Sequence, residues 1–162
     1  PVILGGGQQK GMRSGTENVP AIAAFSEAVQ KTYEDFERKT ERMYQLREYF
    51  IREVTKIAGV TINGAAGKDA APHIVSINAE GVRSEVLLHS LEEQGVYVSA
   101  GSACSSNKPA ASRTLLAIGL KKELLETAVR FSFCQDTTKE EIDYALECLA
   151  KIIPFRRKFT RK

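Results

Sequence analysis

The chain has 162 residues, of which 43% are hydrophobic and 27% are charged, and its formal net charge is +3. This length allows one full domain, or one domain and a piece of another. The composition is typical of a soluble globular protein, and no apolar run approaches the roughly 20 residues that span a bilayer. Residues 1–7 lack the features of a secretory signal and do not begin with Met. We therefore expect an excised or processed piece that does not enter a membrane.

The positive charge is concentrated at the C-terminus. Residues 156–162 contain five basic side chains and no acidic one, so the rest of the chain has 18 basic and 20 acidic residues. A nucleic-acid-binding domain instead carries its basic residues across a folded face. The sequence therefore predicts a solvated basic tail and no nucleic-acid partner.

The three cysteines, Cys104, Cys134 and Cys148, form no CxxC pair and leave one residue unpaired. A disulfide framework or a zinc site needs paired spacing, which His73 and His89 do not complete. We predict no metal site, and reduced thiols in a cytoplasmic protein. Cys134 and Cys148 are expected in the core, and the two histidines are expected to be structural or surface groups.

The first part of the chain predicts a glycine-rich segment followed by a long helix. Five glycines occur among residues 5–15, which allows tight turns but matches neither the P-loop nor the dinucleotide pattern. From Asn18, a capping residue followed by Pro20, apolar residues recur at intervals of three, four or seven. The helix predicted over 18–58 would be roughly 60 Å long, a length that often connects two domains, and a bend along the way stays open.

After Gly59 the pattern alternates between short strands and helices. Strands are predicted at 60–62, 74–77, 96–98 and 128–133, and helices at 83–94, at 112–118 and from Thr138 to just before Pro154. Gly95 would stop the first of these helices, and Thr138 with Glu141 would form a capping box on the last. This order predicts a small α/β domain over 59–155.

Cys104 lies where packing does not explain a cysteine. Its neighbours between 99 and 109 are mainly small residues, typical of an exposed loop, whereas free cysteines are usually buried. Loops on a rigid scaffold often carry chemistry, and a thiol is a strong nucleophile. No adjacent base is visible, so spacing alone leaves both a functional and a non-functional cysteine open.

The loop at 99–106, Ser-Ala-Gly-Ser-Ala-Cys-Ser-Ser, closely resembles the active-site loop of the cysteine desulfurases. These are pyridoxal-phosphate (PLP) enzymes with the class V aminotransferase fold, a fold-type I architecture. Other segments are similar to this family in the same order: the glycine-rich segment at 5–9 with Arg-Ser-Gly-Thr at 13–16, the helix at 112–120, and Val-Arg-Phe-Ser at 129–132. The resemblance covers nearly the whole chain up to about Pro154.

The resemblance implies a role for three residues. Cys104 would attack the sulfur of a substrate cysteine held on PLP, leaving alanine and a Cys104 persulfide, and its loop would swing to an acceptor protein. Arg130 would grip the substrate carboxylate, which suits guanidinium geometry. Thr16 would contact the cofactor phosphate across a dimer interface. The alternatives are that Arg130 is a structural strand residue and that Thr16 caps the long helix.

The resemblance also implies a division of the chain. Residues 1–17 would be a remnant of the large PLP domain, 18–58 the linking helix, 59–155 the small C-terminal domain and 156–162 the tail. The family's PLP lysine follows a histidine in a Ser-x-His-Lys context, and no lysine here has that setting. We therefore expect the chain alone to be inactive, because side chains cannot replace the cofactor as an electron sink.

The resemblance implies partners as well. The full-length parent would be a homodimer that uses L-cysteine and passes sulfur to an acceptor or scaffold protein, for iron–sulfur cluster assembly or thiolation. Two alternatives stay open: a non-catalytic binding or dimerisation module, and a piece of a selenocysteine lyase. The apolar stripe predicted on the long helix favours association in the module alternative.

Overall fold

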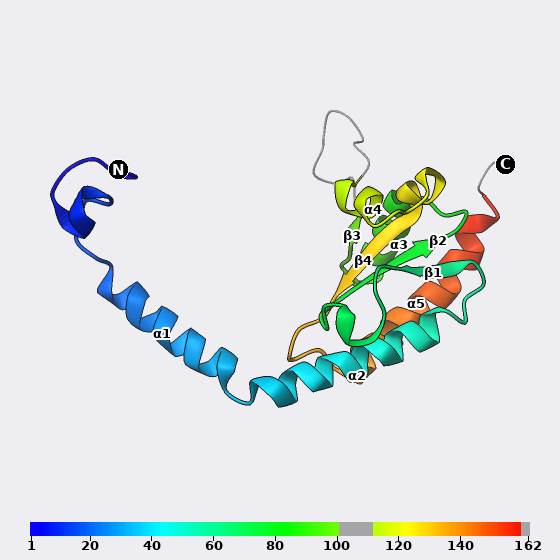
Figure 1. Ribbon diagram of the computed structural model, residues 1–162. Coiled ribbons are helices and arrows are strands. Elements are labelled where there is room, and N and C mark those ends of the chain that lie inside the picture. The colour runs from blue at the N-terminus through cyan, green and yellow to red at the C-terminus, as the bar shows by residue number, and fades with distance from the viewer. Residues whose placement is uncertain (101–111, 160–162) are drawn as a thin grey trace. The chain divides into compact units, whose positions relative to one another are not determined.

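The computed structural model describes residues 1–100 and 112–159 (Figure 1). Contacts within the chain divide it into two compact units, Pro1–Phe36 and Glu37–Lys162, and each is described by itself. The finer division expected at residues 17, 58 and 155 stays a prediction.

The first unit consists of a short irregular segment and one helix. The segment contains a 3-10 turn, η1 (Gln8–Gly11), and a parallel bridge between Ile3 and Arg13. Helix α1 (Val19–Tyr33) begins as predicted, because the Asn18 side chain accepts a hydrogen bond from the backbone N–H of Ala21 at 3.0 Å. No residue of α1 is buried, so its apolar side chains are exposed within this unit.

The helix predicted over 18–58 differs from the structure, which has two helices in that range. Helix α1 ends at Tyr33 and α2 (Phe36–Val54) begins three residues later. Asp35 between them has φ of 52°, a left-handed conformation that an α-helix cannot contain. The apolar spacing continues through this point, so periodicity alone did not reveal the break.

The second unit contains a four-stranded antiparallel sheet. Its strands are β1 (Val60–Asn63), β2 (Ile74–Ala79), β3 (Ser99–Ala100) and β4 (Ala128–Ser132), in the spatial order β1-β2-β4-β3. Short pieces η2 (Gly67–Asp69), α4 (Arg113–Ala117) and η3 (Lys122–Thr127) lie in the connections. Mixed α and β structure is therefore confirmed, in an all-antiparallel form.

Three helices cover one face of this sheet (Figure 1): α2, α3 (Ser84–Glu92) and α5 (Lys139–Arg157). Side chains alternate along a strand, so Val75, Ile77, Val129 and Phe131 all point to this face. They form one core cluster with residues from the three helices, including Phe50, Val54, Leu87, Leu91, Ile142, Leu149 and Ile153. The opposite face is therefore free to carry polar side chains.

The strand predicted at 96–98 is wrong, and the described strand begins at Ser99. The N–H of Val96 donates to the carbonyl oxygen of Leu91 at 2.9 Å, and the N–H of Gly95 donates to Glu92 at 2.9 Å. With Gly95 at φ of 75°, this pair of bonds is the Schellman arrangement that closes a helix. The N–H of Val96 thus completes the end of α3 instead of a strand ladder.

Helix α5 starts as predicted but ends later. The capping box of Thr138 and Glu141 is present, with both hydrogen bonds formed. The predicted stop before Pro154 is wrong, because the helix continues to Arg157. Pro154 removes one N–H donor, while the Arg157 guanidinium donates to the carbonyl oxygens of Glu80 and Ala58 and secures the last turn.

Among the described residues, no helix is both long enough and apolar enough to cross a membrane.

Candidate active site

Arg130 projects from the face of the sheet that the helices leave open. Its neighbours on β4, Val129 and Phe131, are 1% and 5% exposed and belong to the core, whereas Arg130 itself is exposed. The alternation of Val-Arg-Phe-Ser in the sequence therefore has a direct structural meaning. It holds a charged side chain on a rigid strand while its neighbours anchor that strand.

Strand register places a serine on each side of Arg130. Ser99 of β3 and Ser76 of β2 are both directly opposite Arg130, one on each neighbouring strand. Residues opposite each other in a sheet lie on the same face, with Cβ atoms about 5 Å apart. The three side chains therefore form one row across the open face.

The two serines have different partners. Nη2 of Arg130 donates a hydrogen bond to Oγ of Ser99 at 3.2 Å. Oγ of Ser76 instead accepts from Nδ2 of Asn63 on β1 at 3.1 Å. Arg130 therefore hydrogen-bonds to Ser99 and not to Ser76, and we take Arg130, together with this partner, as the candidate substrate-binding site.

The charge of Arg130 is not neutralised within the part of the chain that the structure describes, where Arg130 forms no ion pair. A guanidinium has five N–H donors in a planar fork, and the bond to Ser99 uses one of them. An exposed fork without a carboxylate partner is suited to an anionic ligand, above all a carboxylate bound through two parallel hydrogen bonds.

A network of side-chain hydrogen bonds around a buried amide lies on the same face of the sheet as Arg130. Asn78 is 1% exposed, and its Nδ2 donates to Oδ1 of Asn63 at 2.6 Å. Oγ1 of Thr127, which belongs to η3, lies 3.4 Å from Oδ1 of Asn78 and 3.0 Å from the carbonyl oxygen of Leu124. These hydrogen bonds satisfy polar groups that would destabilise the fold if they were buried without partners. They fix β1, β2 and η3 relative to one another.

Thr16 belongs to the first unit, where it is exposed. Nη1 of Arg13 donates to the carbonyl oxygens of Gly15 and Thr16, at 3.1 and 3.2 Å. The backbone before Thr16 is thereby held in a defined turn. Asn18, and not Thr16, provides the cap of α1, so capping does not explain Thr16.

The predicted nucleophile Cys104 lies outside the described residues, as does most of its loop. Of the other cysteines, Cys148 is buried as predicted, at 6% exposure, but the prediction of a buried Cys134 is wrong. Cys134 follows β4 in an exposed turn, where its N–H donates to Oγ1 of Thr137 at 2.9 Å. His73 and His89 are exposed, as expected for surface groups.

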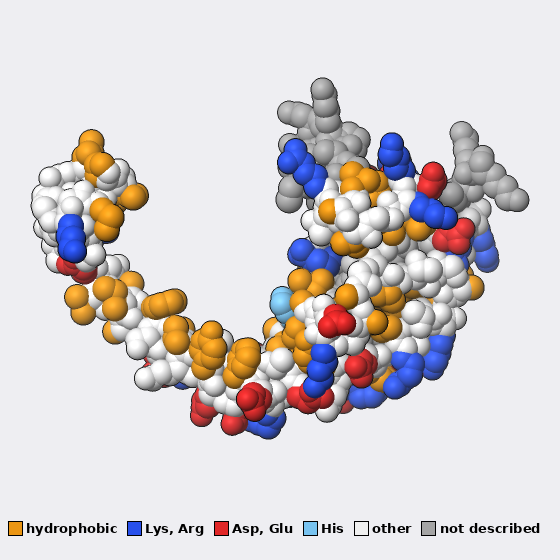
Figure 2. All heavy atoms as spheres, viewed as in Figure 1, with side chains coloured by type: hydrophobic (Ala, Val, Ile, Leu, Met, Phe, Trp, Pro, Cys, Tyr) orange, Lys and Arg blue, Asp and Glu red, His pale blue; other side chains and the backbone are white. Residues whose placement is uncertain are grey.

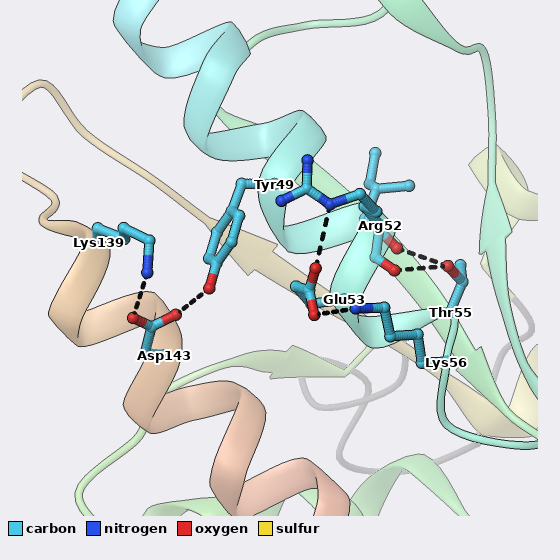
Figure 3. A network of polar contacts seen from close by, with 8 residues as sticks. Tyr49, Arg52, Glu53, Thr55, Lys56, Lys139 and Asp143 are labelled. Carbon is cyan, nitrogen blue, oxygen red and sulfur yellow. Dashed lines mark hydrogen bonds and ion pairs between the residues drawn. The ribbon is translucent and has the colours of Figure 1, made fainter.

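A second polar cluster joins α2 to α5, and sequence reasoning did not identify it (Figure 3). Tyr49 on α2 donates to Asp143 on α5, and Lys139 donates to the same carboxylate at 2.6 Å. These two hydrogen bonds, that of Lys139 first, lower the pKa of Asp143. In the same way Lys56 and then Arg52 lower the pKa of Glu53.

This cluster borders a groove of about 680 Å³ between the two helices. Every charged group in the cluster already has a partner of opposite charge on the protein. Such pairing is typical of a helix–helix contact, and nothing in it requires a ligand. The Arg130–Ser99 pair therefore remains the candidate site within the described part of the chain.

The chain is similar to known proteins over most of its length. Residues 6–145 match the family model described as "Aminotransferase class-V". A "NifS/IcsS protein homolog" of Lactobacillus delbrueckii subsp. bulgaricus is 41% identical over 88% of this chain and 37% of its own length. A "Cysteine desulfurase IscS" of Dictyoglomus turgidum is 39% identical over 94% of this chain and 39% of its own.

Solved structures give the same result. A structure titled "NIFS-LIKE PROTEIN" aligns with a TM-score of 0.80 and 29% identity, over 96% of this chain and 39% of that one. A NifS-like protein from Rickettsia africae aligns with a TM-score of 0.77 and 27% identity, over 94% and 39%. The chain thus spans about two fifths of the length of these relatives. Because the family model covers most of its residues, the chain belongs to the class-V aminotransferase family.

Proposed function

We propose that this chain is the part of a PLP-dependent cysteine desulfurase that supplies the sulfur-accepting thiol and the substrate-carboxylate site. The observation that carries the proposal is Arg130, an exposed guanidinium that forms no ion pair with any described residue and lies beside Ser99. Two relatives with names of this class, NifS/IcsS and IscS, match the chain over most of its length.

In this proposal the substrate is L-cysteine. Arg130 binds its carboxylate, and Cys104 as a thiolate attacks its sulfur. An S–S bond forms at Cys104 as the Cβ–S bond of the substrate breaks. The electron pair of that bond stays with the substrate, whose Cβ takes up a proton to give alanine, and Cys104 is left as a persulfide. When bound, PLP supplies the electron sink that makes this C–S bond labile.

The residues present fit part of a PLP site. Thr16, in the first unit, has an exposed hydroxyl on a turn that Arg13 holds in place, which suits a phosphate oxygen of the cofactor in the partner's site, across the dimer interface. Arg130 suits the carboxylate of an amino acid bound to the cofactor. No lysine of the chain has the Ser-x-His-Lys setting of the family's PLP lysine, so covalent attachment falls to residues outside this sequence.

The destination of the sulfur follows from the same chemistry. A persulfide is a carrier, so the full-length enzyme passes its outer sulfur to an acceptor or scaffold protein, for iron–sulfur cluster assembly or thiolation. We place this reaction in the cytoplasm, with the enzyme as a homodimer.

The test compares two cysteines of the full-length enzyme. Replacing Cys104→Ala should lower alanine release from L-cysteine by about a hundredfold or more, because the nucleophile is lost. Cys134→Ala is the matched control, since the structure describes that thiol as exposed, and it should retain the activity. Full turnover by the Cys104 variant would refute the proposed role. In the same assay, the isolated chain with added PLP should release no alanine.

One observation favours a second function, a dimerisation module. Helix α1 exposes an apolar stripe formed by Ile22, Phe25, Val29 and Tyr33, with Phe25 at 71% exposure (Figure 2). Contiguous exposed apolar surface on a helix marks an interaction site. This function does not exclude the first, because a chain can provide both a dimer contact and a substrate site.

A further inference from the structure

We propose that Ser99 is a positioning residue for Arg130, which it holds in the orientation that binds the substrate carboxylate. This inference rests on the proposed function and extends it to a residue whose role neither the family model nor the relatives' names assign. Its starting point is the hydrogen bond from Nη2 of Arg130 to Oγ of Ser99.

A hydrogen-bonding partner that holds an exposed arginine in place allows it to bind a ligand more tightly. The side chain of Arg130 has many rotamers, and a ligand that must first immobilise it loses affinity. Ser99 removes part of that cost in advance, because its own short side chain projects from a strand that pairs directly with β4. The hydroxyl is thus fixed by the backbone ladder and not by a flexible chain.

The hydrogen bond to Ser99 leaves other N–H groups of the Arg130 guanidinium available to a ligand. Nη2 carries two hydrogens, and the bond to Ser99 uses one of them. The second hydrogen of Nη2 and one of its neighbouring N–H groups remain as a parallel pair, which is the arrangement that a carboxylate accepts. Ser99 therefore orients Arg130 without competing with the substrate.

Ser76 provides an internal contrast. It lies opposite Arg130 on the other neighbouring strand, but its hydroxyl accepts from Asn63. The two serines match in residue type, in strand register and in sheet face. Only Ser99 accepts a hydrogen bond from Arg130. Comparing the effects of replacing each serine therefore measures the contribution of that bond.

The test measures equilibrium binding of two ligands to the full-length enzyme. L-alanine has the carboxylate, and ethylamine is the same molecule without it. In Ser99→Ala the Kd for L-alanine should rise about three- to tenfold, the range expected for one lost hydrogen bond to a charged group. The Kd for ethylamine should stay within about twofold of its value in the unchanged enzyme. Ser76→Ala should leave the Kd for both ligands within the same limit.

Kinetics provide a second measurement. In Ser99→Ala the KM for L-cysteine should rise by a factor similar to that for L-alanine binding, while kcat changes less than about twofold. Ser99→Thr retains a hydroxyl and should restore the original KM. A purely structural role for Ser99 would not give this separation of KM from kcat.

The outcomes separate this inference from the function on which it rests. Equal weakening of both ligands in Ser99→Ala, or no weakening of either, overturns the positioning role. Arg130→Ala distinguishes a failure of the positioning role of Ser99 from a failure of the proposed carboxylate site. If it abolishes the preference for L-alanine while Ser99→Ala leaves that preference unchanged, the inference alone fails. If Arg130→Ala also leaves the preference intact, the proposed carboxylate site fails with it.

Discussion

Arg47 shows how a charged residue can be buried at a structural position. It is 3% exposed and lies on α2, where sequence periodicity assigns no special role to it. Its Nη2 donates to the carbonyl oxygen of Ala65 at 3.1 Å, and its Nε donates to that of Ile74 at 3.4 Å. Arg47 therefore has a structural role: it donates to the segment that joins β1 to β2, at Ala65, and to the first residue of β2, Ile74.

We expect Arg47→Ala to lower the free energy of unfolding of the second unit by about 2–4 kcal/mol. The substitution removes two part-buried hydrogen bonds of a buried guanidinium and the packing of its aliphatic stem. Arg52→Ala is the control on the same helix, because its side chain is 64% exposed, whereas Arg47 is buried. It should cost less than about 1 kcal/mol. Equal urea midpoints for the two variants would contradict this account of Arg47.

Arg130 illustrates what sequence can predict of a site at the level of one residue. Its position between Val129 and Phe131 predicts that it points away from the core, and the structure agrees. The importance of Ser99 could not be predicted in this way. It depends on which residue of another strand lies opposite Arg130, and the pairing register between distant segments is not encoded in local alternation.

At the scale of elements, we expect the contact between α2 and α5 to depend on pH. The folded protein lowers the pKa of Asp143 below its usual value of 3.8, through hydrogen bonds from Lys139 and then from Tyr49. A carboxyl group with a lowered folded-state pKa stabilises the fold above its unfolded pKa. That contribution is lost as the pH falls below about 4, through the lowered value.

Asp143→Asn should therefore reduce the acid sensitivity of the second unit. Its melting temperature should lie below that of the unchanged protein at pH 6, and the difference should shrink steadily as the pH falls from 4 towards 2. Glu147→Gln on the same helix is the control, since its ion pair with Lys151 is long, at 4.0 Å, and exposed. A difference that does not vary with pH would show that the pair is not responsible.

Local signals predicted helix boundaries where the hydrogen-bonding partners are near neighbours in the sequence. The cap at Asn18 and the capping box of Thr138 are hydrogen bonds between near neighbours, so the sequence contains both partners. The break at Asp35 and the continuation of α5 beyond Pro154 depend on one backbone conformation and on distant contacts of Arg157. Periodicity does not contain that information, so those boundaries were missed.

At the scale of the whole molecule, the two units differ in whether their large apolar side chains are buried. The second unit buries its large apolar side chains in one core between the sheet and three helices. The first unit leaves them exposed, including Ile22 at 57% and Phe25 at 71%. Exposed apolar area of this kind favours association by the hydrophobic effect.

We therefore expect the isolated chain to associate with a second copy of itself through α1. Sedimentation velocity should give a mass above the 17.8 kDa of one chain as concentration rises. Phe25→Glu should shift this equilibrium towards the single chain by about tenfold, because it introduces a charge into an apolar contact. No residue of α1 is buried, so the substitution removes nothing from a core.

The control for this experiment adds the same charge elsewhere on α1. Ala24 lies about 200° around the helix from Ile22, on the side opposite the apolar stripe. Ala24→Glu should leave the association constant within about twofold, because a new charge that stays in water has little effect. If both variants weaken association equally, net charge is responsible and the stripe is not the contact. If neither does, the isolated chain associates through another surface, and the proposal of a dimerisation module fails.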